Sequence, residues 1–501
     1  MKEKCYLAVD CGAESGRVMA GLWNGATMRL EELHRFPTGI APVGETKRWD
    51  IARMWGEIER GLGLAAQRFG DAIVSVGADT WGVDYVLVDR AGELVEQPWH
   101  YRDARTRGML EKVKARVSHE EIFAASGVQF MEINTLYQLV AAHERDPALL
   151  ASADKFLMIP DYLHCKMCGA RVGEFTNATT TQFFHPTKQA WSVELLQKLG
   201  LPTAMLPDVV PPGTRLGRLL PGVRERTGLH AGVEVIAPAT HDTGSAVAGL
   251  PGAAMEGRGR HAYISSGTWS LLGVELLAPD LSPRAYELNL TNEGGVDGTY
   301  RLLKNITGLW LVQECRHSFA RSGRTHDYAA LVEAAVAAPA FRSLIDPDDP
   351  LFLSPPDMPA AIAQFCRETG QPVPRAEGEF VRCALESLAV KYATVLHWLK
   401  EMTGSFIGAV NIVGGGSRNR LLNQFTANAC QRPVLAGPVE ATVLGNVLVQ
   451  ARAGGELTSL ADIRRVARAS SEVEEICPEH ASSWSDAQHR FSEIAFRRRI
   501  G

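Results

Sequence analysis

The sequence lacks a long apolar run and a framework of paired cysteines. A membrane-spanning helix needs about 18 uninterrupted apolar residues, and no stretch of this chain approaches that length. The apolar run in the opening MKEKCYLAVDCG is too short for the core of a signal peptide. Nine cysteines in 501 residues make no disulfide scaffold, and Cys366 and Cys383 could pair only if the fold brings them together. These absences predict a cytoplasmic protein.

Signals for metal and nucleic-acid binding are scarce as well. Cys165 and Cys168 form a lone C-x-x-C beside His164, and no second pair completes a zinc site. We interpret the pair as part of a packed helix. The net charge is −5, without a lysine-rich block, and Arg497 to Arg499 are interpreted as a solvated helix end. No nucleic-acid or membrane partner is expected.

A chain of 501 residues is too long for one ordinary core, so two or more domains are expected. Short apolar strands are predicted at 5–10, 17–23 and 71–78, and helices at Ile51 to Phe69 and Ser118 to Ser126. Strands that alternate with helices indicate an α/β protein.

A weak internal repeat links the two halves. HAYISSGTWSLLGVEL reads as strand, glycine turn and strand, as does YLAVDCGAESGRVMAGL, with Gly12 matching Gly267 and Ser15 matching Ser270. Either the similarity is chance or the chain holds two domains of related build.

Further along, residues 408–430 read as strand, Gly-Gly-Gly turn and helix, followed by the strand PVLAG and a helix from near Glu440. The last ~45 residues read as helical. The segment 251–260 has the glycine and charge content of a connector. We therefore predict two domains, at 1–248 and 249–501.

The stretch ATHDTGSA (239–246) contains the first candidate for chemistry. The apolar run Val233 to Ala239 leads into His241 and Asp242, and a helix of small residues follows. Aspartate is among the best N-cap residues, and it is also a suitable general base. Both readings stay open from the local sequence.

Three glycine turns follow apolar strands, at 12–16, 265–268 and 414–416. Glycines let backbone N–H groups converge on an anion, although such loops can also need glycine for geometry alone. None of the turns is a P-loop or a G-x-G-x-x-G dinucleotide fingerprint. The pattern predicts phosphates gripped between two domains by paired hairpins.

These turns carry a resemblance. DCGAESGR, SSGTWS and IVGGGSRN resemble the phosphate and adenosine loops of the actin-like ATPase superfamily. Over essentially the whole chain, further motifs run collinearly with the rhamnulokinase branch of the FGGY-type carbohydrate kinases: VDCGAESGRVM, GADTWGVDYVLVD, YRDARTRG, NTLYQL, FTNATTTQ, ATHDTGSAV, YISSGTWSL, TNEGG, LKNITGLWLVQ and IVGGGSRNRLLNQ. Glu14 departs from the family, which usually has a small residue there.

The resemblance implies two actin-like (ribonuclease H-like) ATPase domains with an interdomain cleft, the first binding sugar and the second nucleotide. It implies phosphorylation of L-rhamnulose at the 1-hydroxyl by ATP, in L-rhamnose catabolism. Asp242 would be the base. Sugar contacts are expected from Gly82, His241, Asp242, Thr243 and Asn305. Nucleotide contacts are expected from Ala13, Glu14, Ser15, Gly16, Arg17, Thr268, Gln313 and Gly415, and Mg²⁺ from Asp10.

Each of these residues also has a plainer reading. Asp10, Asp79 and Asp84 could cap turns at strand ends. Tyr101 to Arg105 could form an internal ion pair, and Arg17 could be solvated. His241 could be a hydrogen-bonded structural residue.

Two rival functions remain from the sequence. One is a kinase of the same fold that acts on another ketose or deoxy sugar. The other is an actin-like ATP-binding switch without a small-molecule acceptor. The expected partners are a sugar and ATP, and the expected state is a monomer or a weak homo-oligomer.

Overall fold

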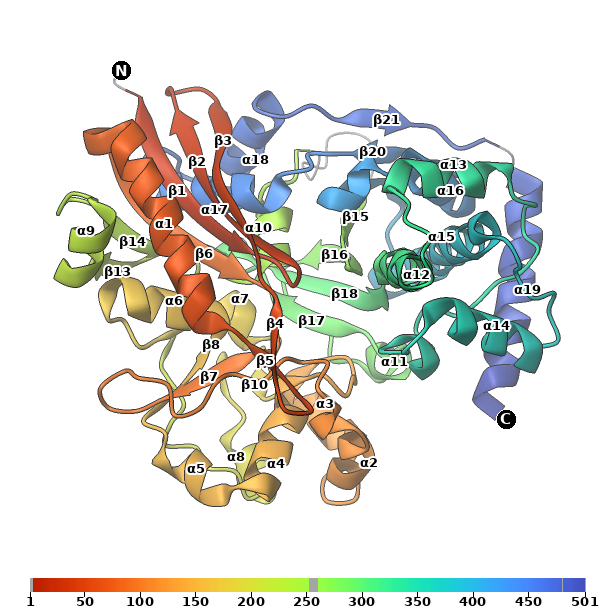
Figure 1. The fold of residues 1–501 in the computed structure, drawn as a ribbon, viewed down its shortest axis with the longest axis horizontal. Coiled ribbons are helices and arrows are strands. Elements are labelled where there is room, and N and C mark those ends of the chain that lie inside the picture. Colours follow the sequence, from red (N-terminus) through yellow and green to blue (C-terminus); the bar gives the residue numbers. More distant parts are fainter. Residues whose placement is uncertain (1–2, 252–259, 480, 501) are drawn as a thin grey trace. The chain divides into compact units, whose positions relative to one another are not determined.

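The computed structural model describes residues 3–251, 260–479 and 481–500 (Figure 1). The chain divides into two compact units. The first contains Met1–Ala254, Glu275–Leu302 and Glu440–Ser471, and the second contains Met255–Val274, Leu303–Val439 and Glu472–Gly501. The connector predicted at 251–260 lies almost entirely outside the described residues.

The first unit is built on a six-stranded sheet with the order β13-β14-β6-β1-β2-β3. β1 pairs antiparallel with β2 and parallel with β6, and β6 pairs parallel with β14. The strands are β1 (Lys4–Cys11), β2 (Ser15–Trp23), β3 (Met28–Pro37), β6 (Ile73–Thr80), β13 (Thr214–Arg218) and β14 (Glu234–Ala237).

Both faces of this sheet are covered. Every residue of β1 from Cys5 onward is buried, as expected for a strand packed on both sides. On one face Gly61 of α1 (Ile51–Phe69) lies against Val18, and on the other Val447 of α17 (Ala441–Ala453) lies against Gly21. Figure 1 shows the two helices flanking the strands.

A second, seven-stranded sheet has the order β17-β18-β16-β15-β19-β20-β21. Here β15 pairs antiparallel with β16 and parallel with β19, which pairs parallel with β20. The strands are β15 (Arg260–Ser266), β16 (Trp269–Leu276), β17 (Thr291–Gly294), β18 (Tyr300–Thr307), β19 (Ile407–Val413), β20 (Val434–Ala436) and β21 (Glu474–Ile476).

The two sheets share one plan. β3-β2-β1-β6-β14 in the first has the same order of hairpin and parallel strands as β18-β16-β15-β19-β20 in the second. The internal repeat seen in the sequence is therefore a structural repeat and not a chance similarity.

The remaining helices of the first unit include a group inserted between β6 and β14. They are α2 (Met109–Lys114), α3 (His119–Ser126), α4 (Thr135–Arg145), α5 (Pro147–Ser152), α6 (Ile159–Cys168), α7 (Phe175–Ala178), α8 (Val193–Lys198) and α9 (Pro221–Thr227). The short strands β7 (Tyr85–Val88) and β8 (Lys155–Met158) pair with each other among them. α10 (Asp242–Ala248), α11 (Pro283–Glu287) and α18 (Leu460–Ala469) complete the unit.

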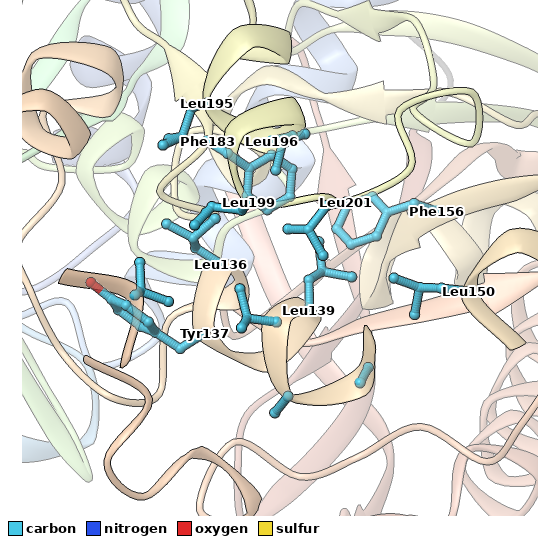
Figure 2. Close-up of a cluster of buried hydrophobic side chains, with 14 of the residues drawn as sticks. Leu136, Tyr137, Leu139, Leu150, Phe156, Phe183, Leu195, Leu196, Leu199 and Leu201 are labelled. Carbon is cyan, nitrogen blue, oxygen red and sulfur yellow. The ribbon is translucent and has the colours of Figure 1, made fainter. Parts of the chain in front are cut away.

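The inserted segment has a hydrophobic core of its own. Leu136 and Leu139 of α4 pack with Leu196 of α8, with Leu199 just after α8 and with Phe156 of β8 (Figure 2). All five side chains are almost completely buried. This core anchors the segment that follows β6, where several candidate site residues lie.

Helices α12 (Trp310–Arg321), α13 (Tyr328–Ala337), α14 (Met358–Glu368), α15 (Glu377–Thr403), α16 (Arg420–Cys430) and α19 (Ala481–Ile500) belong to the second unit. The C-terminal region is mostly helical, as predicted, but β21 interrupts it. Three residues with two exposed glutamates carry too little periodicity to reveal a strand.

The cysteines behave as expected from the sequence. All are free, and Cys165 and Cys168 lie on α6. Cys366 and Cys383, whose pairing the sequence leaves open, are both buried and not joined by a disulfide. Over the described ranges, no cluster of three potential metal ligands occurs, and no helix is long and apolar enough to cross a membrane.

Candidate active site

The candidate site of the first unit lies where parallel strands end. β1 ends at Cys11 and β6 at Thr80, with Asp10 opposite Asp79 in register. The backbone after β14 joins this edge, because Thr80 forms a bridge with His241. The carboxyl ends of parallel strands are the usual ligand edge of an α/β sheet, and here they gather carboxylates.

Helix α10 begins at Asp242, not one residue later. His241 occupies the N-cap position with extended φ and ψ of −78° and 120°, and it makes no side-chain cap bond. Of the two readings of Asp242 taken from the sequence, the one that makes it the N-cap is therefore wrong. Bridge pairing with Thr80 keeps His241 extended, so the helix can start only after it.

Only one carboxylate oxygen of Asp242, Oδ1, accepts hydrogen bonds from the part of the protein that the structure describes. Its Oδ1 accepts hydrogen bonds from the Thr243 backbone N–H at 2.5 Å and from Thr243 Oγ1 at 3.2 Å. The described residues donate no hydrogen bond to Oδ2, and the side chain stays 30% exposed. One carboxylate oxygen is fixed while the other can meet a ligand.

The electrostatics of Asp242 suit a base. Burial raises the pKa of its carboxyl and the nearby Asp10 carboxylate adds to the rise, whereas His241 and the bonds from Thr243 lower it. A raised pKa makes the carboxylate a stronger proton acceptor than an exposed aspartate.

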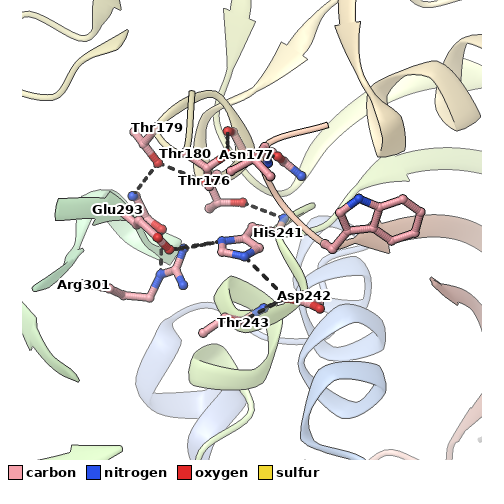
Figure 3. Close-up of polar contacts among 12 residues, drawn as sticks. Thr176, Asn177, Thr179, Thr180, His241, Asp242, Thr243, Glu293 and Arg301 are labelled. Carbon is pink, nitrogen blue, oxygen red and sulfur yellow. Dashed lines mark hydrogen bonds and ion pairs between the residues drawn. The ribbon is translucent and has the colours of Figure 1, made fainter. Parts of the chain in front are cut away.

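His241 connects Asp242 to two buried charges (Figure 3). Its Nε2 lies 3.4 Å from Asp242 Oδ1, and its Nδ1 lies 3.1 Å from Glu293 Oε2. Arg301 Nη2 lies 3.2 Å from the same Nδ1. His241 is thus a hydrogen-bonded residue and also a neighbour of the candidate base.

A second set of contacts fixes the backbone at this point. The His241 N–H donates to Thr176 Oγ1 at 3.1 Å, and Thr176 Oγ1 donates to Glu174 Oε2 at 2.5 Å. Thr240 donates to the same Glu174 oxygen through its N–H and its hydroxyl. Burial raises the pKa of Glu174. The position of Asp242 therefore depends on a segment more than sixty residues earlier.

Asp10 is engaged on one side. Arg17 Nε and Nη2 donate to Asp10 Oδ2 at 3.0 and 2.7 Å, and Arg17 also forms an ion pair with Glu440. The alternative reading of Arg17 as a solvated surface residue is wrong, because its side chain is only 16% exposed. Burial, followed by the charge of Asp10, raises the pKa of Asp79 well above its usual value.

The first glycine turn joins β1 to β2. The Gly12 N–H donates to Ser15 O at 2.9 Å, and Thr38 braces the turn through Gly12 O and Glu14 O. Ala13 and Ser15 are half-buried and Glu14 is exposed. A Cβ on Gly16 would meet the Phe36 ring at 2.5 Å, so glycine is required there for packing.

Gly82 lies in a turn after β6. A Cβ on it would come within 3.0 Å of Thr180. The next residue, Val83, has a φ of 68°, which is strained for a β-branched side chain. Hydrogen bonds from Thr135 and Gln138 to Val83 O hold this conformation. A valine at position 83 gives no indication from the sequence that the backbone has a positive φ there.

Asp84 is fully buried among donors. Burial raises its pKa to about 6, although hydrogen bonds from Gln138, Trp49 and Trp81 act in the opposite direction. In the neighbouring YRDAR stretch, Asp103 accepts from the backbone N–H groups of Lys47 and Arg105. Both aspartates brace local structure.

Four predicted residues lie in the second unit. Thr268 is in the turn between β15 and β16, Asn305 is on β18, Gln313 is on α12 and Gly415 begins the turn after β19. A Cβ on Gly415 would meet nothing within 4 Å, so this turn presents open backbone.

The adjacent Gly416 is tightly packed. A Cβ there would lie 2.0 Å from Ser266 Oγ, so the β15–β16 and β19 turns touch directly. Ser266 Oγ is buried and lacks a hydrogen-bond partner among the described residues. Two of the three predicted glycine turns thus meet in one place.

The two sheets have a common strand order. One carries carboxylates at its strand ends, and the other carries two glycine turns that touch. Known protein families share this architecture. The N-terminal domain of the FGGY family of carbohydrate kinases matches residues 5–249, and its C-terminal domain matches residues 262–454. The chain belongs to the FGGY family of carbohydrate kinases.

Within that family the chain is similar to rhamnulokinases. It is 44% identical to the rhamnulokinase of Bacteroides thetaiotaomicron, over 97% of this chain and 98% of the relative. It is also 44% identical to that of Pectobacterium carotovorum, over 99% of this chain and 97% of the relative.

Solved structures agree on the fold. A ligand-bound xylulose kinase from Lactobacillus acidophilus superposes with a TM-score of 0.79 at 16% identity, covering 98% of this chain and 97% of that one. Plasmodium falciparum glycerol kinase with ADP gives 0.76 at 13% identity, covering 99% and 98%. The predicted fold class is confirmed.

Proposed function

We infer that the protein is an ATP-dependent kinase of L-rhamnulose that forms L-rhamnulose 1-phosphate and ADP, in L-rhamnose catabolism. Full-length similarity to rhamnulokinases supports the substrate. The single observation that carries the chemistry is the Asp242 carboxylate, with Oδ1 bound and Oδ2 open.

In the proposed reaction, Asp242 Oδ2 takes the proton of the sugar's 1-hydroxyl. The sugar oxygen forms a bond to the γ-phosphorus, the bond from that phosphorus to the β–γ bridging oxygen breaks, and ADP leaves. Kinases of this kind depend on positioning and charge neutralisation as much as on the base. We assign contacts with the sugar to Gly82, His241, Thr243 and Asn305.

For the nucleotide, we propose contacts from residues of both glycine hairpins and their neighbours. The first hairpin would contribute Ala13, Glu14, Ser15, Gly16 and Arg17, and the second unit Thr268, Gln313 and Gly415. The open backbone at Gly415 supports this assignment. We likewise propose that residues 1–248 form the sugar-binding domain and residues 249–501 the nucleotide-binding domain.

We propose Mg²⁺ as the accompanying ion, with Asp10 as its protein ligand. The donors fit, because Arg17 occupies only Oδ2 of Asp10, and the buried Oδ1 of Asp79 has no hydrogen-bond partner among the described residues. Mg²⁺ is typically held by one or two carboxylates, waters and phosphates. When bound, it would neutralise phosphate charge.

Because the reaction consumes ATP and the cysteines are free thiols, we propose that the enzyme works in the cytoplasm. We propose a monomer or a weak homo-oligomer.

A coupled ADP-release assay on a panel of acceptors tests the proposal. The panel contains L-rhamnulose, D-xylulose, gluconate and glycerol. We expect rapid ADP release with L-rhamnulose and at least tenfold lower kcat/KM with the others, roughly the discrimination that a few altered pocket contacts provide. If another sugar is preferred, the protein is a kinase of that sugar and not of L-rhamnulose. If ADP is released without any sugar, the protein is an ATP-binding switch and not a sugar kinase.

A further inference from the structure

Behind Asp242 and His241 lie two buried charged side chains, Glu293 and Arg301, to which the proposed reaction gives no part. His241, Glu293 and Arg301 are 6%, 3% and 0% exposed. Glu293 belongs to the TNEGG segment of β17, and Arg301 to β18. Figure 3 shows the two pointing at the imidazole ring from the side opposite Asp242. Buried charges of this kind need a structural or functional reason.

Two polar atoms of other residues meet at Nδ1 of His241. Arg301 Nη2 lies 3.2 Å from it, Glu293 Oε2 lies 3.1 Å from it, and Arg301 Nη2 lies 3.1 Å from Glu293 Oε2. Arg301 is held further by its Nε, which donates to Gly294 O at 2.9 Å. Arg301 Nη2 is thus hydrogen-bonded to the ring nitrogen, and its contact with the Glu293 carboxylate is an ion pair.

This arrangement restricts where the ring proton can be. A neutral imidazole has one donor nitrogen and one acceptor nitrogen, and a guanidinium can only donate. With Arg301 donating to Nδ1, the proton of a neutral ring must be on Nε2. If the ring is an imidazolium with Glu293 as partner, Nε2 again carries a proton. The remaining tautomer could donate from Nδ1 to Glu293 Oε2 at 3.1 Å, but its Nδ1 could then accept nothing from Arg301 Nη2, and a lone pair of Nε2 would face Asp242 Oδ1 at 3.4 Å.

We propose that Glu293 and Arg301 are positioning residues that keep a proton on Nε2 of His241, so that His241 donates to Asp242 Oδ1 and does not relay the sugar proton. This inference rests on the proposed role of Asp242 as base. It explains why only one oxygen of that carboxylate has partners among the described residues. The Thr243 N–H, the Thr243 hydroxyl and His241 Nε2 all approach Oδ1. Oδ2 is then the oxygen that receives the proton.

The role of Glu293 follows from charge. Arg301 has no exposure to solvent, so its cation needs a carboxylate nearby. Glu293 supplies that charge and turns the Nη2 group toward the ring. Without it, Arg301 would lose the partner that holds it at Nδ1.

The first test reads the proton directly. In enzyme labelled with ¹⁵N-histidine, long-range ¹H–¹⁵N correlation spectra separate protonated from unprotonated ring nitrogens, and His241→Gln identifies the signals of His241 by their absence. We expect Nε2 to be protonated near neutral pH. An unprotonated Nε2 would overturn the proposal. Because this readout needs no substrate, it separates a failure here from a failure of the proposed function.

The second test separates hydrogen-bond donation from relay. A Gln amide can donate toward Asp242 and cannot shuttle a proton, whereas Leu can do neither. We expect His241→Gln to retain at least about ten times the kcat of His241→Leu, a typical effect for a supporting hydrogen bond. Equal losses in both variants would show that relay, not donation, is the function of the ring.

Glu293→Gln tests the outer residue, with Glu386→Gln as the matched control. Glu386 is 1% exposed and pairs with Arg382 on α15 at 2.7 Å, so it reports the cost of losing any buried ion-paired carboxylate. We expect Glu293→Gln to lower kcat about tenfold with KM for ATP unchanged, and Glu386→Gln to keep kcat within about twofold. Equal kcat in the two variants would refute a positioning role for Glu293.

Discussion

Helix α10, which presents Asp242, is held by an unusually close approach to α17. An added Cβ on Gly445 of α17 would lie 1.8 Å from the carbonyl oxygen of Ser245 and 3.1 Å from the backbone N of Gly249. Both partners are backbone atoms, which cannot move aside by changing rotamer. We predict that Gly445→Ala forces the two helices apart by more than about 1 Å, since Cβ contacts below about 3 Å are not tolerated.

The size of the effect follows from two opposing contributions. Replacing glycine by alanine inside a helix stabilises it by about 1 kcal/mol, whereas overpacking typically costs about 1–3 kcal/mol and sometimes more. With only backbone to yield, we expect the upper end and a net loss of about 2 kcal/mol or more. In a unit of about 300 residues, this corresponds to a Tm lower by roughly 2–4 °C.

The same shift should affect catalysis. Displacement of α10 moves Asp242 relative to the sugar, and a misplacement of about 1 Å can cost on the order of 100-fold in rate. Differential scanning calorimetry and steady-state kcat, measured below the transition, check both parts.

Gly56→Ala is the control. Gly56 lies inside α1, is exposed, and has open space where a Cβ would be added. This variant should be stabilised by about 0.5–1 kcal/mol and keep its kcat. If Gly445→Ala behaves like Gly56→Ala in both Tm and kcat, the close helix contact does not position the base.

Four further outcomes are expected. Asp242→Asn should retain ATP binding by calorimetry and lose about 10²–10⁴-fold in kcat; near-normal turnover would remove Asp242 as the base. Because burial and Asp10 raise the pKa of Asp242, and only the ionised form accepts a proton, kcat/KM should fall on the acid side through a pKa above the ordinary ~3.9; an acid limb at or below that value would count against the assignment. Thr268→Val should weaken ATP binding more than sugar binding, and calorimetry that gives the reverse order would contradict a phosphate role for that turn. Gly416→Ala should raise KM for ATP about tenfold or more, since its Cβ would collide with Ser266; an unchanged KM would separate this turn from the nucleotide.

Much of the fold could be predicted because its signals are local. α1 has the bounds Ile51–Phe69 that its periodicity predicts, with Asp50 accepting from the Arg53 N–H as N-cap. The two hairpins could be matched because glycine turns and apolar strands recur at both places. The common strand order of the two sheets could not be predicted in the same way, because it depends on strand pairing that the repeated hairpins only suggest.

The immediate site was partly predictable for the same reason. His241, Asp242 and Thr243 are adjacent in sequence, so a motif reveals them together. The placement of the N-cap was wrong because bridge pairing of His241 with Thr80 overrides the local preference for aspartate.

Residues that support the site from elsewhere in the chain could not be found this way. Glu174 fixes the backbone of Thr240, and Glu293 and Arg301 reach His241, through contacts that only the folded chain creates. Each belongs to, or lies near, a motif quoted from the sequence, but an isolated glutamate or arginine does not indicate which histidine it will contact.

The central claim is transfer of the γ-phosphoryl group of ATP to the 1-hydroxyl of L-rhamnulose. Proton-coupled ³¹P NMR of the reaction mixture tests it directly, because a phosphate ester on a CH₂ carbon is split by two protons and one on a CH carbon by a single proton. We predict a new triplet that grows with ADP in equal amounts and fails to form with Asp242→Asn. A doublet, or inorganic phosphate released without any sugar ester, would contradict the account.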